Sequence, residues 1–161
     1  PILYINGGTN NFTDSGQIFT HFLSPQIIMN DIDDDNDLDI LIMGGVLSSF
    51  GLETFLYIND GNGVFTENTT SGLISISGDA KIIDIDGDND KDVFLVGTTT
   101  GTDNVAFLFL NDGSENFTDA NAGFTGLQNG QVEAGDINGD GTIDVIISGT
   151  DDTSSNVLVY T

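Results

Sequence analysis

Apolar residues occur in short runs along the whole chain, separated by polar stretches rich in Asp, Asn and Gly. In the middle of the chain the runs lie at about 79–84, 92–97, 104–110 and 115–119. None of them has the three-to-four-residue spacing of an amphipathic helix. The run at 106–110 is almost entirely apolar, which predicts a strand covered on both faces. The pattern therefore predicts an all-β protein of short antiparallel strands.

This pattern repeats every 52 or 53 residues. One strand motif occurs three times, as Leu3-Tyr4-Ile5-Asn6, Leu56-Tyr57-Ile58-Asn59 and Leu108-Phe109-Leu110-Asn111. Each copy leads into a glycine turn of the kind that joins β-hairpins and then into Phe-Thr-Asp or Phe-Thr-Glu. The predicted units are 1–25 (the end of one unit), 26–78, 79–130 and 131–161 (partial), within one segment, 1–161.

Four short antiparallel strands at this period are typical of a β-propeller blade. We therefore expect a β-propeller-type array of three four-stranded antiparallel blades. Three such blades do not close a ring, so the array is either part of a larger propeller or closed by oligomerisation. The absence of Trp argues against WD40 blades, and the period is too long for a nine-residue β-helix repeat. The chain begins in a strand-like run without Met, and we expect a piece of a longer protein or a processed product.

Three acidic loops recur at the same period and precede an apolar run each time: loop 1 (31–39), loop 2 (84–92) and loop 3 (136–144). Their polar residues stand mainly at positions 1, 3, 5, 7 and 9: Asp31, Asp33, Asp35, Asp37 and Asp39; Asp84, Asp86, Asp88, Asp90 and Asp92; Asp136, Asn138, Asp140, Thr142 and Asp144. Carboxylates so close together repel one another unless a cation lies between them, and oxygen-only ligands suit Ca²⁺. The sequence predicts one Ca²⁺ in each loop, three in all, with position 7 binding through its backbone carbonyl.

The EF-hand is excluded as an alternative, because it needs Glu at position 12 and flanking helices. Position 12 is Ile42, Leu95 or Ile147, inside a predicted strand.

The composition of the chain excludes several classes of function. The 161 residues carry a net charge of −24, with two Lys, no Arg and no Cys. Without basic residues to neutralise phosphates, nucleic-acid binding and attachment to anionic membranes are not expected. No segment is long and apolar enough to span a bilayer, and we expect no signal peptide. His21 has no Cys or Arg to partner it, and the acidic residues are periodic, so we expect no enzyme.

The loop, the strand motif and the Phe-Thr motif together resemble the FG-GAP/VCBS repeat, over essentially the whole chain. This family builds the β-propellers of integrin α subunits and of many bacterial surface proteins. The resemblance implies Ca²⁺ between the first two strands of each blade. Its side-chain ligands would be the residues at positions 1, 3, 5 and 9 of each loop, and Asn138 in place of a carboxylate would weaken the third site.

The resemblance implies a secreted or cell-surface protein, which we expect to be bacterial. The favoured function is a calcium-binding adhesion or interaction module that presents a protein or glycan ligand site at the propeller face, without membrane insertion. Two alternatives remain, a lectin-like carbohydrate binder and an architectural spacer or filament segment. Phe12, Tyr57, Phe65 and Phe117 could serve a lectin as aromatic platforms, but their regular spacing favours packing between blades.

Overall fold

The protein was analysed as a computed structural model that describes residues 2–161. Within this range there are thirteen strands and no helix, so the prediction of an all-β protein is confirmed. The strands are β1 (Tyr4–Asn6), β2 (Phe12–Asp14), β3 (Phe22–Asn30), β4 (Asp39–Val46), β5 (Gly51–Asn59), β6 (Phe65–Glu67), β7 (Ser77–Ile83), β8 (Asp92–Thr98), β9 (Asn104–Asn111), β10 (Phe117–Asp119), β11 (Gln128–Gly135), β12 (Asp144–Thr150) and β13 (Ser155–Tyr160).

The strands form four antiparallel sheets, each built from strands consecutive in the chain. Sheet 1 is β3–β6, sheet 2 is β7–β10, sheet 3 is β11–β13, and the N-terminal hairpin is β1–β2. The expectation of three four-stranded sheets is therefore wrong for one of them, because sheet 3 has three strands. By the repeat register, its fourth strand would lie beyond residue 161, and the N-terminal hairpin corresponds to the last two strands of a unit.

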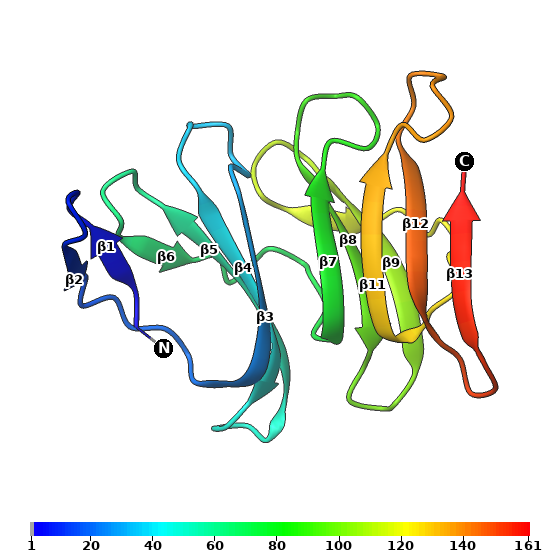
Figure 1. Ribbon diagram of the computed structural model, residues 1–161, viewed down its shortest axis with the longest axis horizontal. Coiled ribbons are helices and arrows are strands. Elements are labelled where there is room, and N and C mark those ends of the chain that lie inside the picture. The colour runs from blue at the N-terminus through cyan, green and yellow to red at the C-terminus, as the bar shows by residue number, and fades with distance from the viewer. Residues whose placement is uncertain (1) are drawn as a thin grey trace.

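The sheets stack face to face in the order of the sequence (Figure 1). One apolar cluster joins sheet 1 to sheet 2 and includes Leu41, Met43 and Leu95. A second joins sheet 2 to sheet 3, and a third joins the N-terminal hairpin and the following segment to sheet 1. A single sheet can bury an apolar face only against another element, so the core of this protein lies between the stacked sheets.

Sheet 2 is covered on both faces. Along β8, Val93 and Leu95 pack toward sheet 1, whereas Phe94 and Val96 pack toward sheet 3, and all four are at most 1% exposed. Neighbouring β9 divides its apolar residues in the same way, so the predicted two-sided coverage of 106–110 is confirmed. Burial of each such side chain contributes roughly 1.5–3 kcal/mol to the stability of the folded protein. Since β8 is buried on both faces, it is the centre of the stack.

Polar contacts between successive sheets join equivalent positions of the repeat. The side-chain amide of Gln26 on β3 donates to Asp79 on β7 at 2.9 Å. Lys81 on β7 forms an ion pair with Glu133 on β11, one repeat further on. The first strands of the three sheets therefore lie next to each other along one side of the stack.

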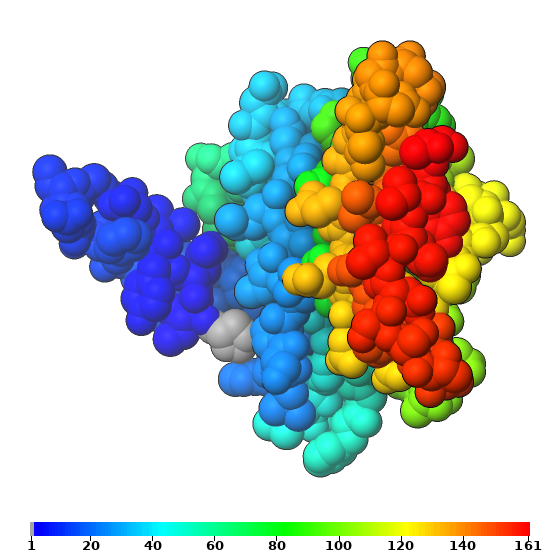
Figure 2. All heavy atoms as spheres, turned by 45° about the vertical axis from the view of Figure 1, so that its right-hand side comes forward, coloured from blue at the N-terminus to red at the C-terminus, as the bar shows by residue number. Residues whose placement is uncertain are grey.

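The two ends of the stack expose apolar side chains. On the open face of sheet 3, visible in Figure 2, Val157 is 69% and Val159 is 52% exposed. On the N-terminal hairpin, Phe12 is 59% exposed, so the expectation that it packs between blades is wrong. Tyr57, Phe65 and Phe117 do pack against or within the apolar clusters, as expected. Phe12 differs because no sheet of the described chain lies over the outer face of its hairpin.

Candidate metal sites

The three acidic loops connect the first and second strands of sheets 1, 2 and 3, and they lie at the same edge of the stack (Figure 1). Position 6 of each loop has the left-handed backbone that its residue type predicts, with φ of 75° at Asn36, 79° at Asn89 and 90° at Gly141. This turn is fastened by the carboxylate at position 1. Asp31, Asp84 and Asp136 each accept the backbone N–H of position 6, at 3.0, 3.1 and 3.0 Å.

The carboxylate at position 9 is buried and joins the end of each loop to its beginning. Asp39, Asp92 and Asp144 are at most 1% exposed, and each accepts the backbone N–H of position 2 of its own loop, at 2.8, 2.9 and 2.7 Å. These carboxylates therefore hold the loops in shape through hydrogen bonds that need no ion.

An asparagine at the end of the third strand completes the closure, and sequence analysis missed this role. The backbone N–H groups of Asn59 and Asn111 donate to the position 9 carboxylates at 2.9 and 3.0 Å. Their side-chain amides donate to the carbonyls of position 8, at 3.2 and 3.1 Å. The sequence predicted these residues only as the last position of the repeated strand motif, before the glycine turn. The available signal was their recurrence about 20 residues after position 9.

In two loops the carboxylates converge. Oxygens of Asp31, Asp33 and Asp39 lie within 4.8 Å of one another in loop 1, and those of Asp84, Asp86 and Asp88 do so in loop 2. The structure therefore brings together positions 1, 3 and 9 in loop 1 and positions 1, 3 and 5 in loop 2. No third group of this kind occurs within residues 2–161, since loop 3 carries Asn138 at position 3.

The crowded carboxylates are electrostatically unfavourable without a cation. Burial raises the pKa of Asp33, and the charges of Asp35 and Asp31 raise it further. Burial also raises the pKa of Asp39 and of Asp92, against the lowering effect of the N–H groups that they accept. A bound cation favours the ionised form and reverses these shifts.

In loop 3, hydrogen bonds from within the loop stabilise a charged carboxylate. The backbone N–H and the hydroxyl of Thr142 donate to Asp140 at 2.8 and 2.6 Å, and these hydrogen bonds lower the pKa of Asp140. With three acidic residues against six in loop 1 and five in loop 2, loop 3 has the weakest attraction for a cation.

Unpartnered oxygens test whether the loops suit a metal ion. Asp31 Oδ1 and Asp37 Oδ1 in loop 1 are buried and have no hydrogen-bond donor among residues 2–161. Asp144 Oδ1 is a third such atom, but the repeat register explains it, because the donor equivalent to Asn111 would follow Thr161. The two loop 1 oxygens, with the converging groups, provide the hard oxygen donors that Ca²⁺ takes.

The side chain at position 7 also lies next to the turn after the third strand. A Cβ built on Gly61 would lie 2.7 Å from Asp37 Oδ2, and one on Gly113 would lie 2.8 Å from Asp90 Oδ2. Glycine is favoured at both positions because φ is 74° and 76°, and an added Cβ would also displace the carboxylate at position 7. The prediction that position 7 binds through its backbone carbonyl stays a prediction.

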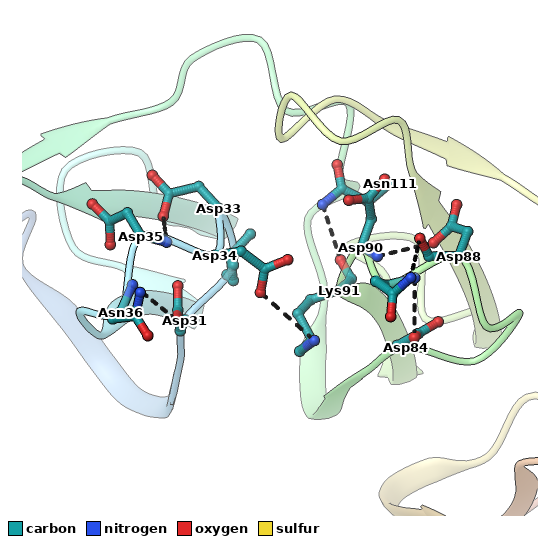
Figure 3. Close-up of polar contacts among 12 residues, drawn as sticks. Asp31, Asp33, Asp34, Asp35, Asn36, Asp84, Asp88, Asp90, Lys91 and Asn111 are labelled. Carbon is teal, nitrogen blue, oxygen red and sulfur yellow. Dashed lines mark hydrogen bonds and ion pairs between the residues drawn. The ribbon is translucent and has the colours of Figure 1, made fainter.

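Loops 1 and 2 lie side by side, as Figure 3 shows, and one ion pair links them. Lys91 Nζ lies 3.8 Å from Asp34 Oδ1. The chain has only two basic residues besides His21, and both lie in the β7–β8 part of sheet 2, where Lys91 contacts sheet 1 and Lys81 contacts sheet 3.

Comparison with known proteins identifies the repeat. Residues 84–147, which include loops 2 and 3 and the strands between them, match the family model of the FG-GAP-like repeat. The resemblance to this family is therefore confirmed, and the chain contains an FG-GAP-like repeat over less than half of its length. No curated protein and no solved structure matches the chain. None of the described residues belongs to a helix that could cross a membrane.

Proposed function

We propose that the protein is a Ca²⁺-stabilised, extracellular interaction module built as part of a β-propeller. The observation that carries the proposal is the convergence of carboxylates at the same edge of successive sheets, at positions 1, 3 and 9 of loop 1 and at positions 1, 3 and 5 of loop 2. A repeated set of preformed oxygen cages is expected of a structural cation site, because catalysis needs one special site rather than several equivalent ones.

The residues of the loops favour Ca²⁺ over Mg²⁺. Ca²⁺ accepts six to eight oxygens in flexible geometry, whereas Mg²⁺ demands a near-ideal octahedron and keeps its waters. The side chains at positions 1, 3, 5 and 9 would hold the ion, with the carbonyl at position 7. Bound there, the ion supplies positive charge that offsets the repulsion between carboxylates. Three ions would change the net charge from −24 to −18 at the most acidic edge.

Thermal unfolding tests this part of the proposal. We expect the melting temperature to rise in millimolar Ca²⁺ well above its value in chelator, and to rise less in Mg²⁺ at the same concentration. NaCl at matched ionic strength is the control, since screening alone also relieves repulsion in a chain of this charge. Equal stabilisation by NaCl and by Ca²⁺ would contradict specific sites.

The propeller arrangement is supported by the register of the exposed face of sheet 3. In the strand ladders, Val157 and Val159 occupy the positions of Ala106 and Leu108. Those two residues pack against sheet 3 inside the stack. The open face therefore has the positions that a further copy of the same repeat would cover, from a longer chain or from a second molecule.

Mass measurements distinguish these sources. A denatured mass well above 17.0 kDa indicates a longer chain, and a native mass that is a multiple of 17.0 kDa indicates association. A native monomer of 17.0 kDa, with Val157 and Val159 open to hydrogen exchange, would contradict a covered face.

An interaction role is supported over catalysis and over sugar binding on aromatic platforms. His21 is exposed, and the acidic groups repeat from sheet to sheet. Tyr57, Phe65 and Phe117 are engaged in the apolar clusters and are not free to stack on a sugar ring. A glycan-array screen with and without Ca²⁺ checks the lectin alternative, and Ca²⁺-dependent binding to defined glycans would favour it.

A further inference from the structure

The turn between β9 and β10 carries a glutamate where the repeat has a smaller residue. Glu115 occupies the position of Gly63 in the preceding unit and of Asn10 in the N-terminal hairpin. All three residues have a left-handed backbone, with φ of 52°, 81° and 62°. Glycine and asparagine adopt this conformation readily, whereas a glutamate is strained there. Some interaction of its side chain is therefore expected to offset the strain.

The turn is held against sheet 1. The Asn68 side-chain amide donates to the Glu115 carbonyl at 3.0 Å, and Phe117 N–H donates to the Ser71 carbonyl at 2.7 Å. Both partners belong to the segment that leaves sheet 1. In Figure 1 this turn, in yellow-green, extends toward the light-blue loop 1.

The direction of the Glu115 side chain is inferred from the equivalent position of the repeat. In the preceding unit, a Cβ built on Gly63 would lie 3.2 Å from Ile5 Cδ1, on the third-strand motif of the neighbouring hairpin. The same relation one repeat later directs Glu115 toward Ile58 on β5. Ile58 precedes Asn59, whose backbone N–H holds the Asp39 carboxylate of loop 1.

The surroundings of Glu115 agree with this placement. It is half-buried, whereas the other residues of its turn, 112–114 and 116, are exposed. Burial raises its pKa, and the charges of Asp33, Asp39 and Asp112 raise it further; the first two belong to the converging group of loop 1. No cation among residues 2–161 pairs with its carboxylate.

The converging group of loop 1 contains one fewer of the loop's central carboxylates than that of loop 2. Its converging group consists of positions 1, 3 and 9, and the position 5 carboxylate, Asp35, stays outside it. In loop 2 the equivalent Asp88 belongs to the group. Loop 1 also holds the two buried, unpartnered oxygens, on Asp31 and Asp37.

We propose that Glu115 supplies a carboxylate oxygen to the cation of loop 1, so that this site is shared between sheet 1 and sheet 2. The inference rests on the proposed Ca²⁺ function of the loops. Loop 1 would then bind more tightly than its own residues allow, and binding would fasten one sheet of the stack to the next.

An NMR titration with Ca²⁺ tests the proposal loop by loop. The backbone amides of Asn36, Asn89 and Gly141 each donate to the position 1 carboxylate of their own loop, so each reports its own site. For Glu115→Gln we expect the dissociation constant reported by Asn36 to rise about tenfold, because one charged ligand is lost. The values reported by Asn89 and Gly141 should stay unchanged, and the spectra themselves verify that the variant is folded.

Two further variants separate coordination from the general effect of charge. Glu115→Asp keeps the charge but shortens the side chain, so it should also weaken loop 1. Glu67→Gln removes the charge of an exposed glutamate on β6 and should leave all three loops unchanged. An unchanged loop 1 in Glu115→Gln, or a Glu115→Asp variant that binds like the parent, would overturn the inference and leave the proposed function intact. Absence of any Ca²⁺-dependent shift in the parent would overturn both.

Discussion

Removing one carboxylate from loop 2 should lower the stability of the protein in Ca²⁺ but not in chelator. Asp88 is exposed, belongs to the converging group, and accepts the Asp90 backbone N–H at 3.0 Å. Asn in its place keeps an oxygen that accepts this hydrogen bond. Asp88→Asn therefore removes a charge and a strong cation ligand, but leaves the internal structure of the loop intact.

The size of the effect follows from linkage between binding and folding. For a site with a dissociation constant on the order of 10⁻⁴ M, about 10 mM Ca²⁺ stabilises the folded state by about 2.7 kcal/mol. A site weakened about 30-fold would retain about 0.9 kcal/mol of this by the same relation. The expected loss of about 2 kcal/mol lowers the melting temperature by roughly 4–8 °C for a chain of this size. In chelator the expected change is zero or a small gain, because Asp88 adds to the repulsion felt by Asp90 and Asp92.

Circular dichroism during thermal unfolding, at matched ionic strength, measures both conditions. Asp103→Asn is the matched control, since Asp103 is an exposed carboxylate in the β8–β9 turn, at the opposite edge of sheet 2. It should change stability equally with and without Ca²⁺. Equal destabilisation by Asp88→Asn in Ca²⁺ and in chelator would refute its assignment as a ligand.

Three further outcomes follow from the site. Asp92→Asn should destabilise the protein by about 1–3 kcal/mol even in chelator. The two Asp92 oxygens accept the backbone N–H groups of Ile85 and Asn111, whereas Asn has one oxygen, so one buried N–H loses its acceptor. Urea unfolding in chelator measures this, and a neutral effect would contradict the structural role. Gly113→Ala should cost about 1–2 kcal/mol, since φ is 76° and the added Cβ meets the Asp90 carboxylate; full stability in the same assay would contradict it. In chelator, stability should rise as pH falls from 7 toward 4, because the raised pKa values of groups such as Asp33 and Asp39 mean that the folded state binds more protons. In Ca²⁺ the same acidification should lower stability, since protons then compete with the ion, and identical pH profiles in the two conditions would contradict bound Ca²⁺.

Periodicity made much of this fold predictable. The apolar runs predicted the four strands of the middle unit within two residues at each end, and the almost continuous apolar run at 106–110 predicted coverage on both faces. The loop motif predicted the left-handed position 6, and the apolar runs on both sides of it predicted a loop between β7 and β8. These features depend on local sequence and on a pattern that occurs three times, so each copy supports the interpretation of the others.

Features that depend on contacts between strands or between sheets were not predicted. The role of Asn111 in closing loop 2 depends on the strand register of β8 and β9, and the loop motif alone does not contain it. The exposure of Phe12 depends on what lies over the N-terminal hairpin, although its motif equals that of the packed Phe65 and Phe117. The proposed approach of Glu115 to loop 1 likewise requires the stacking of two sheets.

Equilibrium dialysis against Ca²⁺, with the metal content of the protein measured at each concentration, tests the central claim most directly. We predict saturable binding that approaches three ions per chain, with dissociation constants on the order of 10⁻⁴–10⁻³ M and the weakest binding in loop 3. Excess Mg²⁺ at equal ionic strength should displace little of the bound Ca²⁺. Binding that never saturates and that NaCl abolishes would mean that the loops only attract a diffuse ion atmosphere, and the account of built cation sites would then be wrong.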